Sequence, residues 1–560
     1  MVVEVPAAVV RLWRRPLKLM LLAVAAGAAV GLSWQPYNLW PLLVPGIAAL
    51  TLLVRASSSD GARLRRSFAV GYVFGAAMLV LAVGWVHVLS IWVAVALVAF
   101  EALFFGLLGM GLTLVSRLRL WPLAAACCWV LTEFAYSRIP FGGFGWTRVA
   151  YAVVDTPLAG FLPVVGVVGV SFLVALIGQV LAWMVLAAWT ARRQLRAGWP
   201  LRAGRSLTAG LVLVGLLVLT GVGLGRFQVE PASGRSGSVN VGIVQGNVPG
   251  RGIEAMGRAR SVTNNHLSET VDLITRSRLG LSPKPDFLLW PENSTDIDPL
   301  RDRGTHQIVQ SAAQIAGVPI LVGAVTEGPG PDERQTSALW WDPQRGVLAR
   351  YDKRNLVPFG EWIPFRSALL SVLPILRQVG AQSVPGTEPG VLTVEAGGRQ
   401  LKVGDVICFE LAYDATVYET VTEGAQVLMV QSNNATYGGT GQIEQQFAIT
   451  RARAMEARRE IAVATTNSVS GFVDRNGSVV SRTDEFSAAS LVVSMPLRAT
   501  NTPAVVLAPW LGRLLALTGL LCCLVGAAAR RARRTADPGR VQQDGATRSD
   551  QPAAVGGRAE

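Results

Sequence analysis

Eight apolar runs constrain the fold of this chain more than any other feature. A transmembrane helix needs about 20 mainly apolar residues. The runs cover residues 17–33, 37–54, 68–89, 91–115, 119–137, 162–190, 207–226 and 505–528. With 51% hydrophobic residues, the composition is also too apolar for an ordinary soluble protein. The sequence therefore predicts a multi-pass α-helical membrane domain of about eight spans, with one long insertion before the last.

Basic residues indicate the two sides of the membrane. Arginines cluster before the first run and after the second, fourth, sixth and eighth, whereas the linkers after the first and third runs contain no Lys or Arg. Cytoplasmic loops carry an excess of Lys and Arg. Both termini are therefore predicted in the cytoplasm and residues 227–504 outside it. The first run also resembles a signal peptide, but another apolar run follows directly, which favours its retention.

The long insertion reads as a separate domain that does not bind nucleic acid. Residues 227–504 contain 25 Lys plus Arg and 28 Asp plus Glu, so the net charge of +14 comes from the arginines beside the apolar runs. Strand-like stretches such as SVNVGIVQGNV alternate with helical patterns such as 442–459, which is typical of an α/β sandwich. The expected division is a membrane domain 1–226, an extracytoplasmic domain 227–504, an eighth span 505–528 and a disordered cytoplasmic tail 529–560.

Three polar residues end apolar strands of this domain: Glu292 in FLLWPEN, Lys353 in LARYDKRN and Cys408 in DVICFE. Side chains at strand ends converge on a site in α/β domains. Cys408 is the one cysteine of residues 227–504, so no disulfide forms within them. Lys353 is one of four lysines beside 47 arginines, which suggests a need for a compact ammonium. The alternatives are a buried core cysteine and a surface lysine.

A carboxylate, an ammonium and a thiol are sufficient for acyl transfer. Glu292 can take the thiol proton, and Cys408 can form a thioester. Lys353 and the backbone N–H after Cys408 can stabilise the oxyanion. Histidine is not required, and both His266 and His306 are expected on helix surfaces. We expect no metal or other cofactor.

The motifs WPEN, YDKRNLVPFGEWIP and ICFE, in this order, resemble the Glu-Lys-Cys triad of the nitrilase superfamily. Their position between the seventh and eighth spans resembles the apolipoprotein N-acyltransferases of bacterial lipoprotein maturation. That resemblance implies an α-β-β-α sandwich and a plasma-membrane enzyme. It implies transfer of an acyl chain from a phospholipid to the amino group of diacylglyceryl-cysteine on an apolipoprotein, by a ping-pong mechanism. It assigns the base to Glu292, the oxyanion stabiliser to Lys353, the nucleophile to Cys408, and orienting roles to Glu361 and Glu410.

Two departures from the family pattern concern aromatic residues. Phe409 follows the nucleophile where the family commonly has Tyr, so a phenol hydroxyl is lost while the backbone donor remains. The loop that commonly contains a Trp-Phe-Gly run reads ATYGGTG, which leaves Tyr437 as the candidate lipid contact.

Two further segments are candidate lipid contacts. Trp362 and Leu373 lie in WIPFRSALLSVLPIL, which is either a membrane-facing lid or a core helix. Arg148 lies in an aromatic linker that is either an interfacial belt or a rim that meets phosphate headgroups.

Two other functions compete with acyl transfer. A membrane-tethered amidase could use the same triad for hydrolysis, although eight spans exceed what tethering needs. A non-enzymatic scaffold for a partner enzyme would not require Glu292, Lys353 and Cys408 together. The resemblance also allows a polyprenol-phosphate mannosyl synthase as a partner, because some actinobacterial relatives are fused to one or associate with one.

Overall fold

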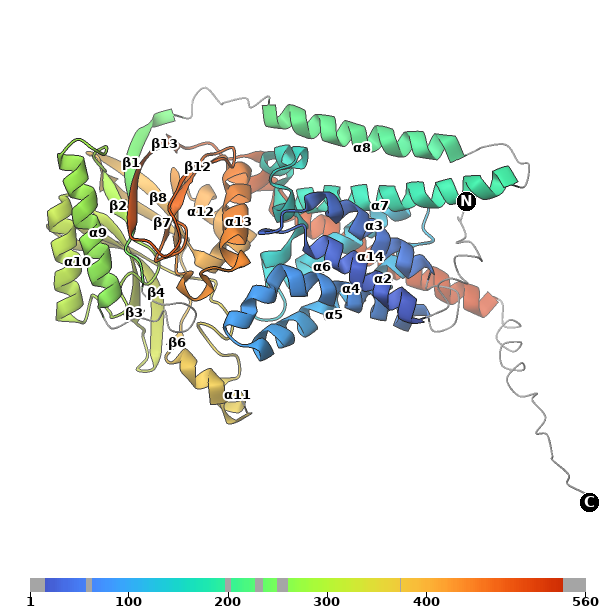
Figure 1. The fold of residues 1–560 in the computed structure, drawn as a ribbon, viewed down its shortest axis with the longest axis horizontal. Coiled ribbons are helices and arrows are strands. Elements are labelled where there is room, and N and C mark those ends of the chain that lie inside the picture. The colour runs from blue at the N-terminus through green and yellow to red at the C-terminus, as the bar shows by residue number, and fades with distance from the viewer. Residues whose placement is uncertain are drawn as a thin grey trace, which may run out of the picture.

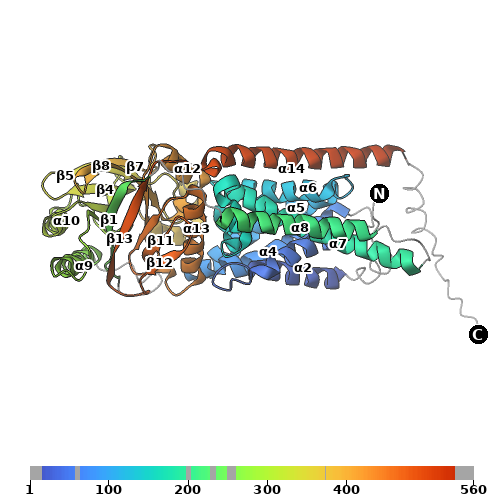
Figure 2. The same cartoon turned by 90° about the horizontal axis from the view of Figure 1, so that it is seen from above.

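The computed structural model describes residues 16–56, 63–196, 203–226, 235–248, 260–372 and 374–536, and the chain forms two parts (Figure 1). One part is a bundle of long helices, and the other is an α/β domain at one end of that bundle. Viewed from above, the last helix runs the length of the bundle and returns the chain from the α/β domain (Figure 2).

All eight apolar runs coincide with helices. The helices are α2 (Pro16–Gly31), α3 (Leu43–Ala56), α4 (Arg63–Val83), α5 (Ile91–Val115), α6 (Trp121–Tyr136), α7 (Leu162–Arg196), α8 (Ala203–Arg226) and α14 (Pro503–Ala536). Short 3-10 helices connect them: η1 (Trp40–Leu42), η3 (Gly84–Val88), η4 (Gly145–Thr147), η5 (Val149–Val153) and η6 (Pro157–Phe161). Among the described residues, five helices are long and apolar enough to cross a membrane, and two shorter apolar helices accompany them. The chain is therefore a membrane protein.

Glycines let the bundle helices approach closely. A Cβ atom on Gly27 would lie 2.1 Å from the Phe74 carbonyl oxygen, and one on Gly71 would lie 2.2 Å from the Phe105 carbonyl oxygen. Small residues at such crossings allow the van der Waals packing that holds helices together in lipid. In α7, Gly166 has φ of 67° and kinks the helix where it meets the α/β domain.

The α/β domain contains two mixed sheets. Their strands are β1 (Arg235–Gln245), β2 (Phe287–Leu289), β3 (Ile320–Glu327), β4 (Glu333–Asp342), β5 (Gly346–Asp352), β6 (Gln382–Ser383), β7 (Val391–Ala396), β8 (Arg399–Ile407), β9 (Val427–Ser432), β10 (Ile461–Thr465), β11 (Gly471–Val473), β12 (Val479–Arg482) and β13 (Ala489–Arg498). The first sheet has the order β13-β1-β2-β3-β4-β5, with β6 also paired to β4, and the second has the order β12-β11-β10-β9-β8-β7. Strands β4 and β5 form an antiparallel hairpin that turns at residues 342–346.

Helices cover the outer face of each sheet. On the first sheet lie α9 (Ser261–Arg278) and α10 (Arg303–Ala316), and on the second lie α12 (Asp414–Thr422) and α13 (Gly441–Ala457). An apolar core that includes Ile243, Trp340 and Met429 fills the space between the sheets. The predicted α-β-β-α sandwich is therefore present. Figure 1 shows that α12 and α13 face the helix bundle, so the second sheet lies nearer the membrane part.

Candidate active site

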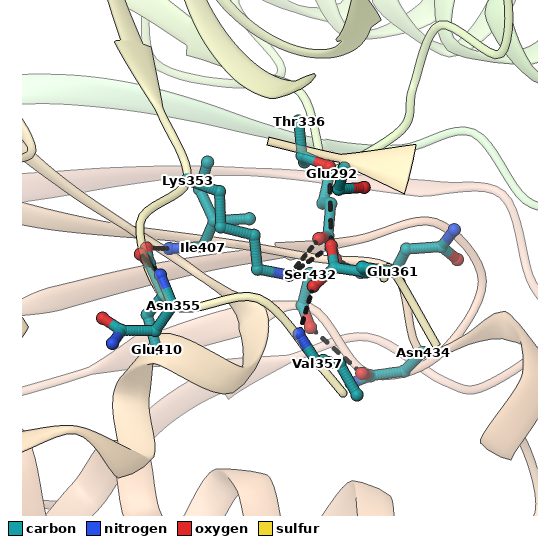
Figure 3. Close-up of polar contacts among 12 residues, drawn as sticks. Glu292, Thr336, Lys353, Asn355, Val357, Glu361, Ile407, Glu410, Ser432 and Asn434 are labelled. Carbon is teal, nitrogen blue, oxygen red and sulfur yellow. Dashed lines mark hydrogen bonds and ion pairs between the residues drawn. The ribbon is translucent and has the colours of Figure 1, made fainter. Parts of the chain in front are cut away.

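Three strand ends bring the predicted triad together. Glu292 lies just after β2, Lys353 follows β5, and Cys408 follows β8. The Lys353 ammonium Nζ donates to Glu292 Oε1 at 2.8 Å and to Glu361 Oε1 at 2.9 Å (Figure 3). Only 1% of Lys353 is exposed. The lysine is therefore buried between two carboxylates and is not a surface residue.

Cys408 occupies a strained backbone position. It begins the 3-10 turn η9 (Cys408–Ala412) with φ of 54°, in the left-handed region that favours glycine. A strained backbone of this kind is typical of a nucleophilic residue that a sharp turn exposes to the substrate. Burial and then the charge of Glu292 raise the pKa of the Cys408 thiol to about 12, against the opposing effect of Lys353. At neutral pH the group is a thiol, so a nucleophilic role would require a base.

The two carboxylates around Lys353 are themselves fixed by backbone donors. Glu292 Oε2 accepts from Asn433 N at 2.8 Å, and Glu361 Oε2 accepts from Val357 N at 2.7 Å. Burial lowers the pKa of Lys353, but the charges of Glu292 and Glu361 outweigh it and hold that pKa well above its usual value. The ammonium is thus permanently charged, as an oxyanion stabiliser must be.

Glu410 joins the loop after Lys353 to the strand before Cys408. Its carboxylate accepts from the backbone N–H groups of Arg354, Asn355 and Ile407 at 2.8, 3.0 and 2.9 Å. It also accepts from the Tyr351 hydroxyl at 2.9 Å. One side chain therefore holds the segment after Lys353 and the segment before Cys408. The orienting role of Glu410 stays a prediction from the family resemblance.

A second polar set beside the thiol was not predicted from the sequence. Ser432 ends β9; its hydroxyl accepts from Gln446 Nε2 at 2.8 Å and donates to Asn434 Oδ1 at 3.0 Å. The side-chain hydrogen bond between Ser432 and Cys408 offsets part of the rise in the Cys408 pKa. Figure 3 shows the hydrogen bond from Ser432 to Asn434, which leads away from the Lys353 side chain. The signal in the sequence is the polar run that follows the apolar strand VLMV, at the same strand-end position as the triad.

Aromatic rings form a wall beside Phe409, the residue that follows Cys408. Phe409 stacks on Phe144 and Trp146, with ring centroids 5.8 and 6.1 Å apart. Tyr437, the predicted lipid contact, lies edge-on to Trp85 at 5.1 Å. The aromatic wall is therefore built from both parts of the chain, and Tyr437 belongs to it.

The remaining predicted residues have different surroundings. Trp362 is half-buried against Phe141, with ring centroids 5.8 Å apart. Leu373 lies outside the described residues. Arg148 is 5% exposed and paired with Asp414, so it is not placed for the headgroup contact that its linker suggested.

His266 is fully buried, and the prediction of a surface position was wrong. Its ring packs against Trp290 at a tilt of 43°, with centroids 5.6 Å apart, and Nδ1 lies 2.7 Å from the Val262 carbonyl oxygen. Burial lowers its pKa to about 4. His306 is exposed, as expected. Neither histidine contributes to the triad described above.

Asp405 is an unexpected carboxyl group in the core. It lies on β8 between the inward-facing Val403 and Ile407 and is fully buried, and among the described residues no side chain donates a hydrogen bond to its carboxyl oxygens. Burial, followed by the charges of Glu410 and Glu292, raises the pKa of Asp405 well above its usual value. Burial therefore favours the neutral, protonated form of Asp405.

The Asp405→Asn variant should be more stable than the wild type at pH 8. An acid whose pKa is raised on folding lowers stability as the pH rises from its unfolded pKa, about 3.9, toward its folded pKa. Asparagine has no such dependence. Melting in detergent should show a gain of at least about 2 °C at pH 8 that disappears near pH 4. A gain that is equal at both pH values would contradict the neutral state of Asp405.

Comparisons with known proteins agree with both parts of the fold. Residues 26–180 match the family model described as apolipoprotein N-acyltransferase N-terminal domain, and residues 280–502 match the one described as carbon-nitrogen hydrolase. The apolipoprotein N-acyltransferase of Mycolicibacterium smegmatis is 35% identical over 511 residues, which cover 90% of this chain and 84% of that protein. The apolipoprotein N-acyltransferase of Vibrio cholerae is 25% identical over 506 residues, covering 86% and 92%.

Among solved structures, an amidase from Nesterenkonia sp. is 19% identical and covers 48% of this chain and 94% of that one, at a TM-score of 0.35. The curated relatives align with both the helix bundle and the sandwich. The triad of Glu292, Lys353 and Cys408 lies within the matched carbon-nitrogen hydrolase region. The chain therefore belongs to the apolipoprotein N-acyltransferase family.

Proposed function

We propose that this membrane enzyme transfers an acyl chain from a phospholipid to the N-terminal amino group of a diacylglyceryl-cysteine peptide through a thioester on Cys408. The observation that carries the proposal is the buried Lys353 ammonium held between Glu292 and Glu361 beside Cys408. A nucleophile, a base and a fixed cation form the minimal set for acyl transfer. The names of the relatives support the lipoprotein acceptor.

The first half-reaction consumes the phospholipid. Glu292 takes the Cys408 proton while Sγ forms a bond to the ester carbonyl carbon. The resulting oxyanion is stabilised by the Lys353 ammonium and the Phe409 backbone N–H. Collapse breaks the ester C–O bond, Glu292 returns the proton to the departing glycerol oxygen, and a lysophospholipid leaves. The acyl group remains on Cys408 as a thioester.

The second half-reaction consumes the acceptor. The amino nitrogen attacks the thioester carbon, and Glu292 takes one proton from that nitrogen. The same two donors stabilise the second oxyanion. Collapse breaks the C–S bond, Cys408 regains a proton from Glu292, and the amide product leaves. The aromatic wall of Phe409, Trp146 and Trp85 supports this course, because a dry site limits competition by water for the thioester.

The proposed topology places the active site outside the cytoplasm. It has eight spans, both termini in the cytoplasm and domain limits at 1–226, 227–504, 505–528 and 529–560. The alternation of basic linkers supports it. The setting is the bacterial plasma membrane. A polyprenol-phosphate mannosyl synthase as partner remains an expectation from the family resemblance.

The segment after Trp362 is our candidate for the membrane-facing lid through which acyl chains approach Cys408. It contains α11 (Arg366–Val372) and η8 (Pro374–Val379). Phe365 is 74% exposed and lies edge-on to Phe141, at 6.0 Å between centroids. The described part of this segment lies largely at the surface, which supports the membrane-facing reading over a core helix. An exposed aromatic beside a membrane part is suited to the lipid interface.

The Phe365→Asp variant should lower acyl transfer from vesicle phospholipid by about tenfold or more, because a carboxylate opposes insertion into lipid. Its melting temperature should stay within about 2 °C of the wild type, since Phe365 is exposed. The matched control is Leu348→Asp on β5, an exposed apolar residue outside this segment. A loss of folding in Phe365→Asp would instead support the core reading.

Mass spectrometry of one lipoprotein N-terminus tests the proposal. Cells that contain the chain should yield a lipoprotein with a third acyl chain, on the amino group, and cells that lack it should not. Free fatty acid with lysophospholipid, and no N-acylated peptide, would indicate the hydrolase alternative.

A further inference from the structure

A continuous set of buried charges joins the α/β domain to the helix bundle. Arg148 lies in the linker between η4 and η5, with Nη1 2.6 Å from Asp414 Oδ1 at the start of α12. Its Nε lies 3.7 Å from Glu133 Oε2 at the end of α6. The side chains of Arg148 and Glu133 are 6% and 4% exposed, and that of Asp414 is 15% exposed. One guanidinium thus bridges an acid of each part.

The charges continue from Asp414 toward the nucleophile. Arg453 on α13 donates from Nη2 to Asp414 Oδ1 at 2.8 Å and from Nε to the Leu411 carbonyl oxygen at 2.8 Å. Leu411 belongs to η9, the turn that begins at Cys408. Arg453 is fully buried. A chain of direct contacts therefore runs from α6 of the bundle to the turn that carries the thiol.

Two other buried contacts fix the same interface. Glu456 accepts from Arg453 Nη1 at 2.6 Å and from Val167 N, next to the kink of α7, at 2.7 Å. The Gln445 side chain on α13 donates to the carbonyl oxygens of Gln35 and Ala82 at 2.8 and 2.7 Å. The bonds of Glu456 to Val167 and of Gln445 to Gln35 and Ala82 join the α/β domain to the helix bundle. The bond between Arg453 and Glu456 extends the set of buried charges. The two parts are thus held in one relative orientation.

Buried ion pairs of this kind are poor devices for stability alone. The desolvation of two charges can exceed their attraction, and apolar residues of similar volume often stabilise as well or better. Compared with apolar contacts, buried ion pairs fix a specific geometry, because each pair is hydrogen-bonded in one arrangement only. The set of charges from Glu133 to Arg453 is therefore suited to setting the position of the Cys408 turn above the membrane part.

We infer that Arg148 is a positioning residue, which seats the Cys408 turn for substrates held in the bilayer. The inference rests on the proposed function and deepens it. Arg148 acts through Asp414 and does not touch the reacting atoms. A misplacement of about 1 Å can cost about 100-fold in rate. A substrate fixed in a membrane cannot follow a shifted thiol, whereas a small soluble ester can diffuse to it.

The experiment compares two acyl donors on the purified full-length chain. One is phosphatidylethanolamine in vesicles with a diacylglyceryl-cysteine peptide as acceptor; the other is p-nitrophenyl acetate in solution, corrected with Cys408→Ala. The Arg148→Gln variant should lower transfer from vesicles by about tenfold or more and change acetylation of Cys408 by less than about twofold. A purely structural defect would lower both rates together. Arg148→Lys, which keeps the charge but is shorter, should show the same split with a smaller loss.

The matched control is Arg138→Gln, an exposed arginine between α6 and η4, which should behave as the wild type. Equal losses in Arg138→Gln and Arg148→Gln would overturn the inference and indicate a general effect of linker charge. Equal losses on both donors, or no loss on either, would overturn it as well. A wild-type chain that does not acylate the peptide would overturn the proposed function itself, and a normal wild-type rate separates that outcome from the others.

Discussion

The Glu292→Gln variant is expected to lose acyl transfer by about 100- to 10,000-fold, the usual contribution of a positioned general base. Glutamine has nearly the same shape and can still accept from Lys353, but it cannot take the Cys408 proton. The Cys408 thiol has a pKa raised to about 12, so little thiolate forms without that base. Initial rates of peptide acylation in vesicles measure the loss.

The Glu292→Gln variant should also change the pKa of the Cys408 thiol. That change favours the reactive thiolate, although the activity falls. The charge of Glu292 raises the pKa of Cys408, whereas Lys353 lowers it. Removing the carboxylate charge should therefore lower the thiol pKa while activity falls. Ultraviolet absorbance of the thiolate during a pH titration, with Cys408→Ala subtracted, measures this pKa. Glu327→Gln, an exposed glutamate at the end of β3, is the matched control and should change neither quantity. An unchanged or higher thiol pKa in Glu292→Gln would contradict the described electrostatics.

The Lys353→Arg variant should acylate at under about 1% of the wild-type rate. The substitution keeps the charge, so an exposed ion pair, worth about 0 to 1 kcal/mol, would survive it. An oxyanion donor must lie about 2.7 to 3.1 Å from the developing oxygen, and loss of one donor costs about 100- to 1,000-fold. The planar guanidinium is larger than the ammonium that fits between Glu292 and Glu361.

The matched control is Lys402→Arg. Lys402 lies on β8 in the same domain, but it is exposed and donates to the Glu423 carbonyl oxygen at 2.9 Å. That variant should keep the wild-type rate. Near-normal turnover in Lys353→Arg would remove Lys353 from the catalytic assignment and leave Glu292 and Cys408 without their cation.

Periodicity and strand ends were enough to find the triad region. Glu292, Lys353 and Cys408 each follow an apolar strand, and strand ends converge for geometric reasons that need no homologue. The hairpin around 342–346 and the helix of α13 were also readable, because turn residues and helical spacing are local signals. Local signals of this kind predict a helix or strand and its direction. A site is then expected where the ends of several strands meet.

Ion pairs between residues far apart in the sequence could not be predicted from local signals. Arg148 and Asp414 are 266 positions apart, and nothing local indicates that the linker packs under α12. The burial of His266 could not be predicted either. The buried side of α9 includes Thr263 and Thr270, and these polar residues make that side look solvent-exposed in the sequence. Asp405 could have been noticed in the sequence, because an acidic residue type between Val403 and Ile407 interrupts the apolar alternation of the strand that leads to Cys408.

The central claim is that the acyl group passes through Cys408, and intact-mass measurement of the purified chain tests it most directly. After incubation with phospholipid alone, the wild-type chain should gain the mass of one acyl group. Neutral hydroxylamine should remove that mass, since a thioester is labile to it, and Cys408→Ala should show no gain. Acyl transfer to peptide that persists in Cys408→Ala, or an acyl group that is mapped to another residue, would contradict the claim.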